Sequence, residues 1–205
     1  MMTANRNTYK INYQTKKTIL MTKKIKFLIL AFLVIVGRFY DAYTTYLYTP
    51  DLTYESNIIV KFFGAGWFSV IIFQALLVII VIYCLYYYFF RYKTTLPTDN
   101  NLTKNEFISY LNFANTTSFY KIFYRTPNNK NLLFATIGYI ASMTLIFVSY
   151  IVGTSTLFLL ISSRYKELYK HGIPTILYCM IGSLAIYFSI RFYQIEYKKY
   201  KKSNF

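Results

Sequence analysis

Four polar residues interrupt an otherwise apolar stretch near the start of the chain, and their side chains are the best suited to chemistry. Arg38, Asp41, Thr44 and Thr45 all lie between residues 25 and 48. On a helix, offsets of three and seven residues place Arg38, Asp41 and Thr45 within about 60° of one another. We therefore expect Asp41 to form an ion pair with Arg38, with Thr45 on the same side of the helix.

A glutamine in the next apolar stretch is placed to reach this group. Gln74 lies seven residues after Trp67, where that stretch begins, and Asp41 lies seven residues before Tyr48, where the first stretch ends. On neighbouring antiparallel helices the two side chains lie at similar depth. We expect Gln74 to be the interhelical hydrogen-bond partner of Asp41.

Polar residues in the connecting segments are expected at the same end of the helices. Glu55 and Asn57 stand between the first two apolar stretches, and His171 and Arg164 stand between the last two. The predicted polar, ligand-binding cluster is Arg38, Asp41, Thr44, Thr45, Glu55, Asn57 and Gln74. Asp41, Glu55 and His171 are the candidates for catalysis, because a low-dielectric site can drive the pKa values of two carboxylates apart.

The distribution of apolar residues predicts an all-α polytopic membrane protein. Hydrophobic residues make up 56% of the chain and charged residues 15%, and the charges gather between long apolar runs. Four runs, at about residues 25–48, 67–90, 132–161 and 173–192, reach the roughly 20 residues that a hydrocarbon core requires. We expect one transmembrane domain, residues 25–205, after a basic tail, residues 1–24. Arg38 and Asp41 then lie at membrane depth, where an ionisable group costs a few kcal/mol and needs a partner.

Basic residues predict the side of the membrane that each connection faces. Lysines and arginines are concentrated in residues 1–26, in the 91–131 loop and after residue 190, and such flanks stay in the cytosol. Both termini and the 91–131 loop are therefore expected inside. The third connection is an exception, since it holds Arg164, Lys166 and Lys170, but four spans place it outside. The expected location is the cytoplasmic (inner) membrane.

The beginning of the chain has alternative interpretations. Met21 opens a segment that looks like a translation start of its own, so residues 1–20 are treated as an extension that the fold does not need. A basic segment before the apolar run Phe27–Val36 also suits a cleaved signal peptide. No small-residue cleavage site follows that run, where Gly37 and Arg38 come next, so an uncleaved first span is preferred.

The 91–131 loop contains a predicted amphipathic helix. Thr103 is followed three residues later by Glu106, the pattern of a capping box, and then by Phe107, Tyr110 and Leu111 at helical spacing. Two placements remain open from the sequence. The helix lies on the inner membrane surface, or it packs beneath the helix bundle.

Small residues recur at helical spacing in the last two apolar runs and predict close helix packing. The first of these stripes is Ala135, Gly138, Ser142, Ser149, Gly153 and Thr156, and the second is Thr175, Cys179, Gly182 and Ser189. Small side chains allow helices in a membrane to approach closely. Packing is therefore expected for both stripes.

The first hairpin resembles a known family. Asp41, Thr44 and Thr45 form a D-x-x-T-T pattern, and Glu55 and Asn57 follow as E-x-N. This is similar to the D-x-x-T-T…E-x-N-P signature of a family of small, uncharacterised prokaryotic membrane proteins. The match covers about residues 38–66, and Ile58 stands where that family has proline. The resemblance implies that these five polar residues act as one unit, and it implies no activity.

Three classes of function are compatible with this sequence. The favoured one is a non-enzymatic integral membrane protein whose polar cluster fixes the helices or binds a small ligand or a partner. The alternatives are an outer-leaflet enzyme that uses Asp41, Glu55 and His171, and a small transporter or channel component. Anionic lipid at the basic face and a homo-oligomer or partner membrane protein are the expected partners, and nucleic acid is not. With one histidine and two separated cysteines, neither a metal nor a cofactor is expected.

Overall fold

All the regular structure in the described part of the chain is helical. A computed structural model describes residues 3–52, 66–94, 96–97, 99, 101–117 and 119–203, with side chains described from residue 20 onward. Within these residues the structure contains helices and no strand, in agreement with the predicted all-α class. Glu55 and Asn57, two members of the predicted cluster, lie outside the described residues.

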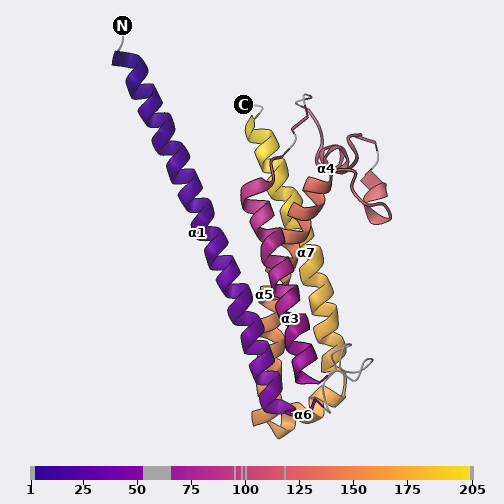
Figure 1. Cartoon of the computed structure of the whole chain (residues 1–205). Helices are drawn as coiled ribbons and strands as arrows, with labels where there is room; N and C mark the ends of the chain where they lie inside the picture. Colours follow the sequence, from indigo (N-terminus) through magenta and orange to yellow (C-terminus); the bar gives the residue numbers. More distant parts are fainter. Residues whose placement is uncertain are drawn as a thin grey trace.

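Four long helices run up and down in chain order (Figure 1). They are α1 (Thr3–Tyr48), α3 (Trp67–Tyr86), α5 (Lys130–Ile161) and α7 (Ile173–Ser203), with a π-helical turn η1 (Tyr87–Arg91) extending α3. The short helix α6 (Ser163–Lys170) joins α5 to α7. The start of α1 and the end of α7 lie at one end of the bundle, and α6 lies at the other. Residues Thr3 to Lys24, expected as a tail, continue α1 as helix.

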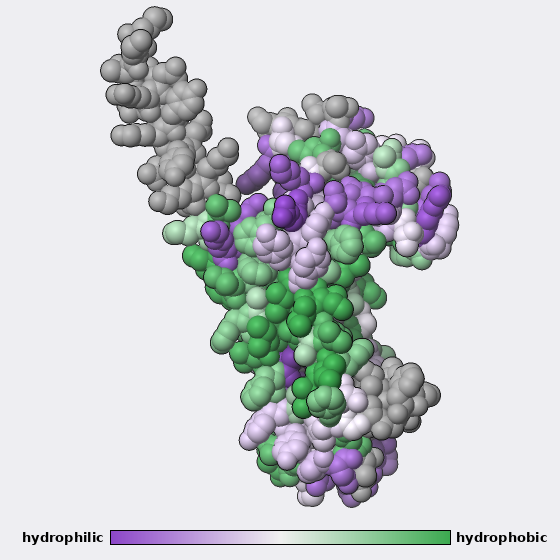
Figure 2. All heavy atoms as spheres, viewed as in Figure 1, coloured by the Kyte–Doolittle hydropathy of each residue, from purple (hydrophilic) through white to green (hydrophobic). Residues whose placement is uncertain are grey.

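Among the described residues, three helices are long and apolar enough to cross a membrane: Trp67–Arg91, Lys130–Ile161 and Ile173–Ser203. The helix α1 is not among these three. Its outer face is nevertheless apolar, because Leu28, Phe32 and Phe39 are each more than 60% exposed. On the face seen in Figure 2, hydrophobic residues gather across the middle of the molecule, with hydrophilic residues towards both ends.

The helix α5 is the central element, and it packs against α1, α3 and α7. The predicted stripe of small residues on α5 makes this possible, since Ala135, Gly138, Ser142, Ser149 and Gly153 are all buried. The closest approach is at Gly138, where an added Cβ would lie 2.2 Å from the carbonyl oxygen of Cys84 on α3. A side chain at Gly138 would therefore collide with the backbone of α3.

Among the described residues, no helix packs against the second predicted stripe, on α7. Thr175, Cys179 and Gly182 are exposed, and an added Cβ at Gly182 would meet nothing within 4 Å. Ser189 is half-buried, and its hydroxyl donates to Ala185 O of its own helix. The packing predicted for α7 is not seen within the described residues, because helical spacing defines a face without indicating whether a neighbour covers it.

The capping box predicted in the middle loop is confirmed. The helix α4 (Lys104–Phe113) begins at Thr103, whose hydroxyl accepts from Glu106 N–H while the Glu106 carboxylate accepts from Thr103 N–H at 2.7 Å. These hydrogen bonds to Thr103 lower the pKa of Glu106. The apolar face of α4, with Phe107 and Leu111, is buried against Phe192 and Tyr200 of α7. Of the two placements left open, the structure therefore shows the helix packed at the end of the bundle.

Tyrosines of α7 fasten the middle loop to the bundle. Tyr200 donates to Asp99 O at 2.7 Å and accepts from Leu102 N–H at 3.0 Å, and Tyr197 donates to Leu102 O at 3.2 Å. Tyr193 donates to Asn112 Oδ1 at 3.2 Å. The loop is thus held along two turns of α7 by hydroxyl groups.

A buried carboxylate completes this end of the bundle. Glu196 is fully buried, and it is paired with Lys199 Nζ at 2.5 Å. It also accepts hydrogen bonds from Thr94 and Tyr92, which follow η1. Burial, reinforced by this carboxylate, raises the pKa of Tyr92. Glu196 therefore ties the end of α3 to α7.

Candidate functional site: a cavity around Arg38 and Asp41

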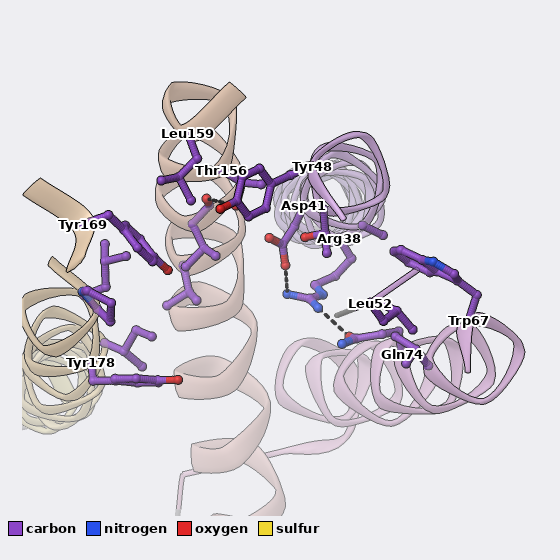
Figure 3. A pocket seen from close by; sticks show the side chains of 18 residues that line it. Arg38, Asp41, Tyr48, Leu52, Trp67, Gln74, Thr156, Leu159, Tyr169 and Tyr178 are labelled. Carbon is purple, nitrogen blue, oxygen red and sulfur yellow. Dashed lines mark hydrogen bonds and ion pairs between the residues drawn. The ribbon is translucent and has the colours of Figure 1, made fainter. Parts of the chain in front are cut away.

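A cavity of about 280 Å³ lies between the helices at the α6 end of the bundle (Figure 3). Its walls come from α1, α3, α5, α6 and α7. The polar and aromatic lining residues are Arg38, Asp41, Thr45, Tyr48, Trp67, Gln74, Thr156, Tyr169 and Tyr178. Apolar residues from α5 and α7, including Val148, Val152, Leu177 and Ile181, form much of the remaining surface. The cavity is therefore mostly apolar, with a small number of polar groups.

An ion pair on α1 provides the charged groups of the cavity. Arg38 Nη1 lies 2.8 Å from Asp41 Oδ2, one turn away on the same helix. The same guanidinium donates from Nη2 to Gln74 Oε1 of α3 at 2.6 Å, and from Nη1 to Ser149 Oγ of α5 at 3.3 Å. The Arg38 side chain therefore connects three helices.

A close crossing of α1 and α5 sets the position of this ion pair. At Gly153 an added Cβ would lie 2.7 Å from the Tyr40 ring, and at Gly37 it would lie 3.2 Å from Ser149 Cβ. Tyr40 also packs on Tyr150, with ring centroids 5.9 Å apart, and shares a hydrogen bond with Thr154 at 3.2 Å. Small residues on both helices thus bring the Arg38 side chain within reach of α5.

The two threonines of the predicted cluster have different roles. Thr45 lines the cavity. Thr44 is fully buried, and its hydroxyl donates to Tyr40 O and Asp41 O of its own helix, each at 3.0 Å. Thr44 therefore packs within the bundle and stabilises the turn that carries Asp41.

Gln74 is linked to Asp41 through arginine. The sequence predicted a hydrogen bond between Gln74 and Asp41, and the structure shows the Gln74 side-chain oxygen bonded to Arg38. Figure 3 shows Asp41, Arg38 and Gln74 as a row joined by two polar contacts. The depth argument thus identified the correct residue on α3, and the arginine occupies the position between the two side chains.

Two tyrosines form the opposite wall, and the sequence argument missed them. Tyr169 comes from α6 and Tyr178 from α7, and both hydroxyl groups point towards the interior of the cavity (Figure 3). Tyrosine is abundant in this chain, with 24 residues, so its type alone does not distinguish these two. The spacing of Tyr169 and Tyr178 across the α6–α7 turn could have identified them only if the position of that turn over the cavity had been known.

Trp67, at the start of α3, lines one end of the cavity. Its indole nitrogen donates to Pro50 O at 2.6 Å, and its ring packs edge-on against Tyr46 with centroids 5.5 Å apart. Leu52, which adopts a left-handed backbone conformation with φ of 61°, is buried beside it and lines the cavity. These contacts hold the segment after α1 against the start of α3.

His171 and Arg164 lie apart from the ion pair. His171 follows α6 as its C-cap and is exposed, and Arg164 is also exposed. Neither residue lines the cavity. Of the three candidate catalytic residues, Asp41 is in the cavity, His171 is outside it, and Glu55 falls in the segment that the structure does not describe.

The chemistry available in the cavity is hydrogen bonding beside a neutral ion pair. The guanidinium and the carboxylate compensate each other's charge, and the cavity offers tyrosine hydroxyls across from them. Within the described residues, no group of three or more histidine, cysteine or acidic side chains is arranged to hold a metal ion. Cys84 and Cys179 are both free.

Comparisons with known proteins add no assignment. No family model, curated protein or solved structure matches this chain.

Proposed function

We propose that this protein is an integral membrane protein with four helical spans that binds a small amphiphilic ligand in the Arg38–Asp41 cavity. The observation that carries the proposal is an ion pair exposed to a mostly apolar cavity that five helices surround. Small-molecule sites in proteins are mainly apolar, with a few placed polar groups. At about 280 Å³, the cavity is slightly smaller than the usual range of about 300–1,000 Å³.

In this proposal α1 is the fourth span, with both termini in the cytosol. Three other helices have the length and composition to cross a membrane, and α1 packs lengthwise on α5, which is one of them. The exposed Leu28, Phe32 and Phe39 side chains extend the apolar surface onto α1. Arg38 and Asp41, the charged residues of α1 between positions 27 and 48, are paired with each other, which lowers the cost of their insertion.

The proposed ligand has a hydrogen-bonding end and an apolar body. The polar end would lie between the Arg38–Gln74 side and the tyrosine hydroxyls, and the body would contact Val152 and Leu177. Because the ion pair is neutral overall, a ligand without net charge suits the site better than a strongly anionic one.

A structural role for the same network is the second candidate. Arg38 bonds to residues of α1, α3 and α5, and buried polar contacts of this kind fix helix register in some proteins. Binding and structure are compatible, because a network that orders the helices also shapes the cavity. Catalysis has weaker support, since His171 does not line the cavity. The family resemblance in the first hairpin remains a proposal that rests on the sequence pattern alone.

Filling the cavity tests ligand binding. Leu177→Trp places a large side chain in the cavity, while Ile176→Trp changes the adjacent residue, which is 62% exposed and outside the lining. We expect native mass spectrometry of the chain, released from nanodiscs of cell lipid, to show a bound small molecule in the wild type and in Ile176→Trp. The Leu177→Trp variant should lose that mass while remaining folded. Equal retention of the mass by both variants, or an unliganded wild type, would contradict the proposal.

A further inference from the structure

The 119–125 segment of the middle loop, which we call the aromatic turn, holds three large rings in the open. It comprises the short helix η2 (Phe119–Phe123) and the two residues after it. Tyr120, Phe123 and Tyr124 are 77%, 78% and 75% exposed. Three adjacent rings exposed to this degree form an apolar patch that the rest of the described chain does not cover.

The aromatic turn has a defined shape. The amides of Tyr124 and Arg125 both donate to Lys121 O, at 3.2 Å and 2.8 Å. The Phe119 ring packs edge-on against Tyr120 and Phe123, with centroids 5.8 Å and 6.2 Å apart. The rings are therefore presented by a hydrogen-bonded turn.

The loop connections place this turn beside the start of a candidate span. On one side, Asn128 N–H donates to Asn112 O of α4 at 2.9 Å, and Asn112 in turn bonds to Tyr193 of α7. On the other side, α5 begins at Lys130, five residues after Arg125, so the two are separated by at most about 18 Å. Figure 1 shows this part of the loop projecting sideways from the bundle, near the end that holds both termini.

Every charge in and next to the aromatic turn is positive. Lys121 and Arg125 belong to it, and Lys130 follows. The sequence contains no acidic residue between Glu106 and Glu167. Aromatic rings interleaved with basic residues are suited to a leaflet rich in anionic lipid, where an apolar layer of acyl chains lies under a layer of negatively charged headgroups.

We propose that the aromatic turn docks on the anionic lipid headgroups of the leaflet on the side of the chain termini, with its rings in the interfacial layer. The inference rests on the proposed membrane-spanning bundle, which brings that leaflet to the start of α5. It adds a lipid-binding surface separate from the cavity. A protein partner for the same patch would have to bring its own acidic groups, whereas the leaflet lies next to the turn in any case.

Spin labels on the full chain in nanodiscs test the docking. In a background with Cys84→Ala and Cys179→Ala, we would label Phe123→Cys in the turn, Asn105→Cys on the exposed side of α4, and Ile79→Cys on α3, where the native side chain is 63% exposed. Collision rates with oxygen and with a water-soluble nickel complex report lipid and water contact. Nanodiscs of phosphatidylcholine with or without phosphatidylglycerol supply the two surfaces.

We expect the label at position 79 to be in lipid in both nanodiscs and the label at 105 to be in water. The label at 123 should move from water into the interface when phosphatidylglycerol is present. Adding Lys121→Gln and Arg125→Gln should lower the equilibrium constant for docking about fivefold for each charge removed. Because these two changes leave the Tyr120 and Tyr124 rings in place, they separate charge from apolar contact.

The possible outcomes distinguish this inference from the proposed function. If the label at 79 is in lipid and the label at 123 is in water in both nanodiscs, the docking is overturned and the membrane-spanning bundle stands. That result would assign the patch to a protein partner. A label at 79 in water would overturn both. A label at 123 in the interface irrespective of phosphatidylglycerol would overturn the anionic-lipid requirement.

Discussion

Removing one member of the Arg38–Asp41 pair should destabilise the bundle far more than removing both. In Arg38→Met, the Asp41 side chain, which is 12% exposed, keeps a carboxylate without its guanidinium. Breaking a buried pair in this way costs about 3–5 kcal/mol, and we expect a value near the lower end because a cavity adjoins the pair. The hydrogen bonds to Gln74 and Ser149 add roughly 0.6 kcal/mol each.

The double variant isolates the interaction between the two charges. Arg38→Met combined with Asp41→Leu replaces the pair by apolar side chains of similar volume, and such replacements are often neutral. We expect the double variant to lie within about 1.5 kcal/mol of the wild type, the remaining loss coming from the contacts to Gln74 and Ser149. The coupling energy between positions 38 and 41, calculated from the two single variants and the double variant, should then be at least about 2 kcal/mol.

Reversible unfolding in mixed micelles, titrated with a denaturing detergent, measures these differences. Ser149→Ala is the matched control, because it removes one 3.3 Å hydrogen bond from the same guanidinium and leaves both charges in place. It should cost less than about 1 kcal/mol. If Arg38→Met costs no more than Ser149→Ala, or if the double variant equals the sum of the singles, the pair does not hold the bundle as described.

Two further predictions concern packing and pH. Gly138→Leu should prevent α5 from packing on α3, because its Cβ alone would lie 2.2 Å from Cys84 O. Gly182→Leu should fold normally, since no described atom lies within 4 Å of a Cβ at that site. The yield of monodisperse protein from membranes compares the two variants, and equal yields would contradict the close approach. The lowered pKa of Glu106 means that the carboxylate stabilises the start of α4 fully above its unfolded pKa of about 4.5. This contribution is lost as the pH falls through the lower folded value. Hydrogen exchange, corrected for intrinsic rates, should therefore show reduced protection of the first turn of α4 in acid in the wild type. Glu106→Gln should show little change between the two pH values. An equal change in both proteins would refute the dependence of this turn on the Glu106 carboxylate.

The sequence predicted elements that depend on local spacing. The capping box of Thr103 and Glu106 was predictable because both partners lie within four residues. The ion pair of Arg38 with Asp41 was predictable for the same reason. The buried stripe around Gly138 was also correct, since small residues on a long apolar helix favour close contact.

Features that depend on which helices meet were not predictable from spacing. Gly182 has the same pattern around it as Gly138, yet no helix in the described part of the chain covers it. In the sequence, nothing distinguishes Tyr197 and Tyr200 from the other tyrosines of the chain. Only the fold shows that their hydroxyl groups bond to the middle loop. Tyr178 is one of many aromatic residues on the apolar runs, and the fold alone places its hydroxyl in the cavity.

Buried charge at the other end of the bundle was likewise missed. Glu196 lies in a stretch of the sequence rich in basic residues, but it is fully buried and paired with Lys199. The i, i+3 spacing of these two residues was visible in the sequence. Their burial depends on the segment after η1, where Thr94 and Tyr92 reach across to α7, and no local pattern encodes that contact.

The most direct test of the account is whether α1 crosses the membrane, because the ion pair lies at membrane depth only if it does. In a background with Cys84→Ala and Cys179→Ala, Lys23→Cys and Asp51→Cys mark exposed positions on the two sides of the apolar part of α1. We predict that a membrane-impermeant maleimide labels position 51 in intact cells and position 23 only after the membrane is permeabilised. Labelling of both positions from the same side would show that α1 does not span, and would contradict the placement of Arg38 and Asp41 within the membrane.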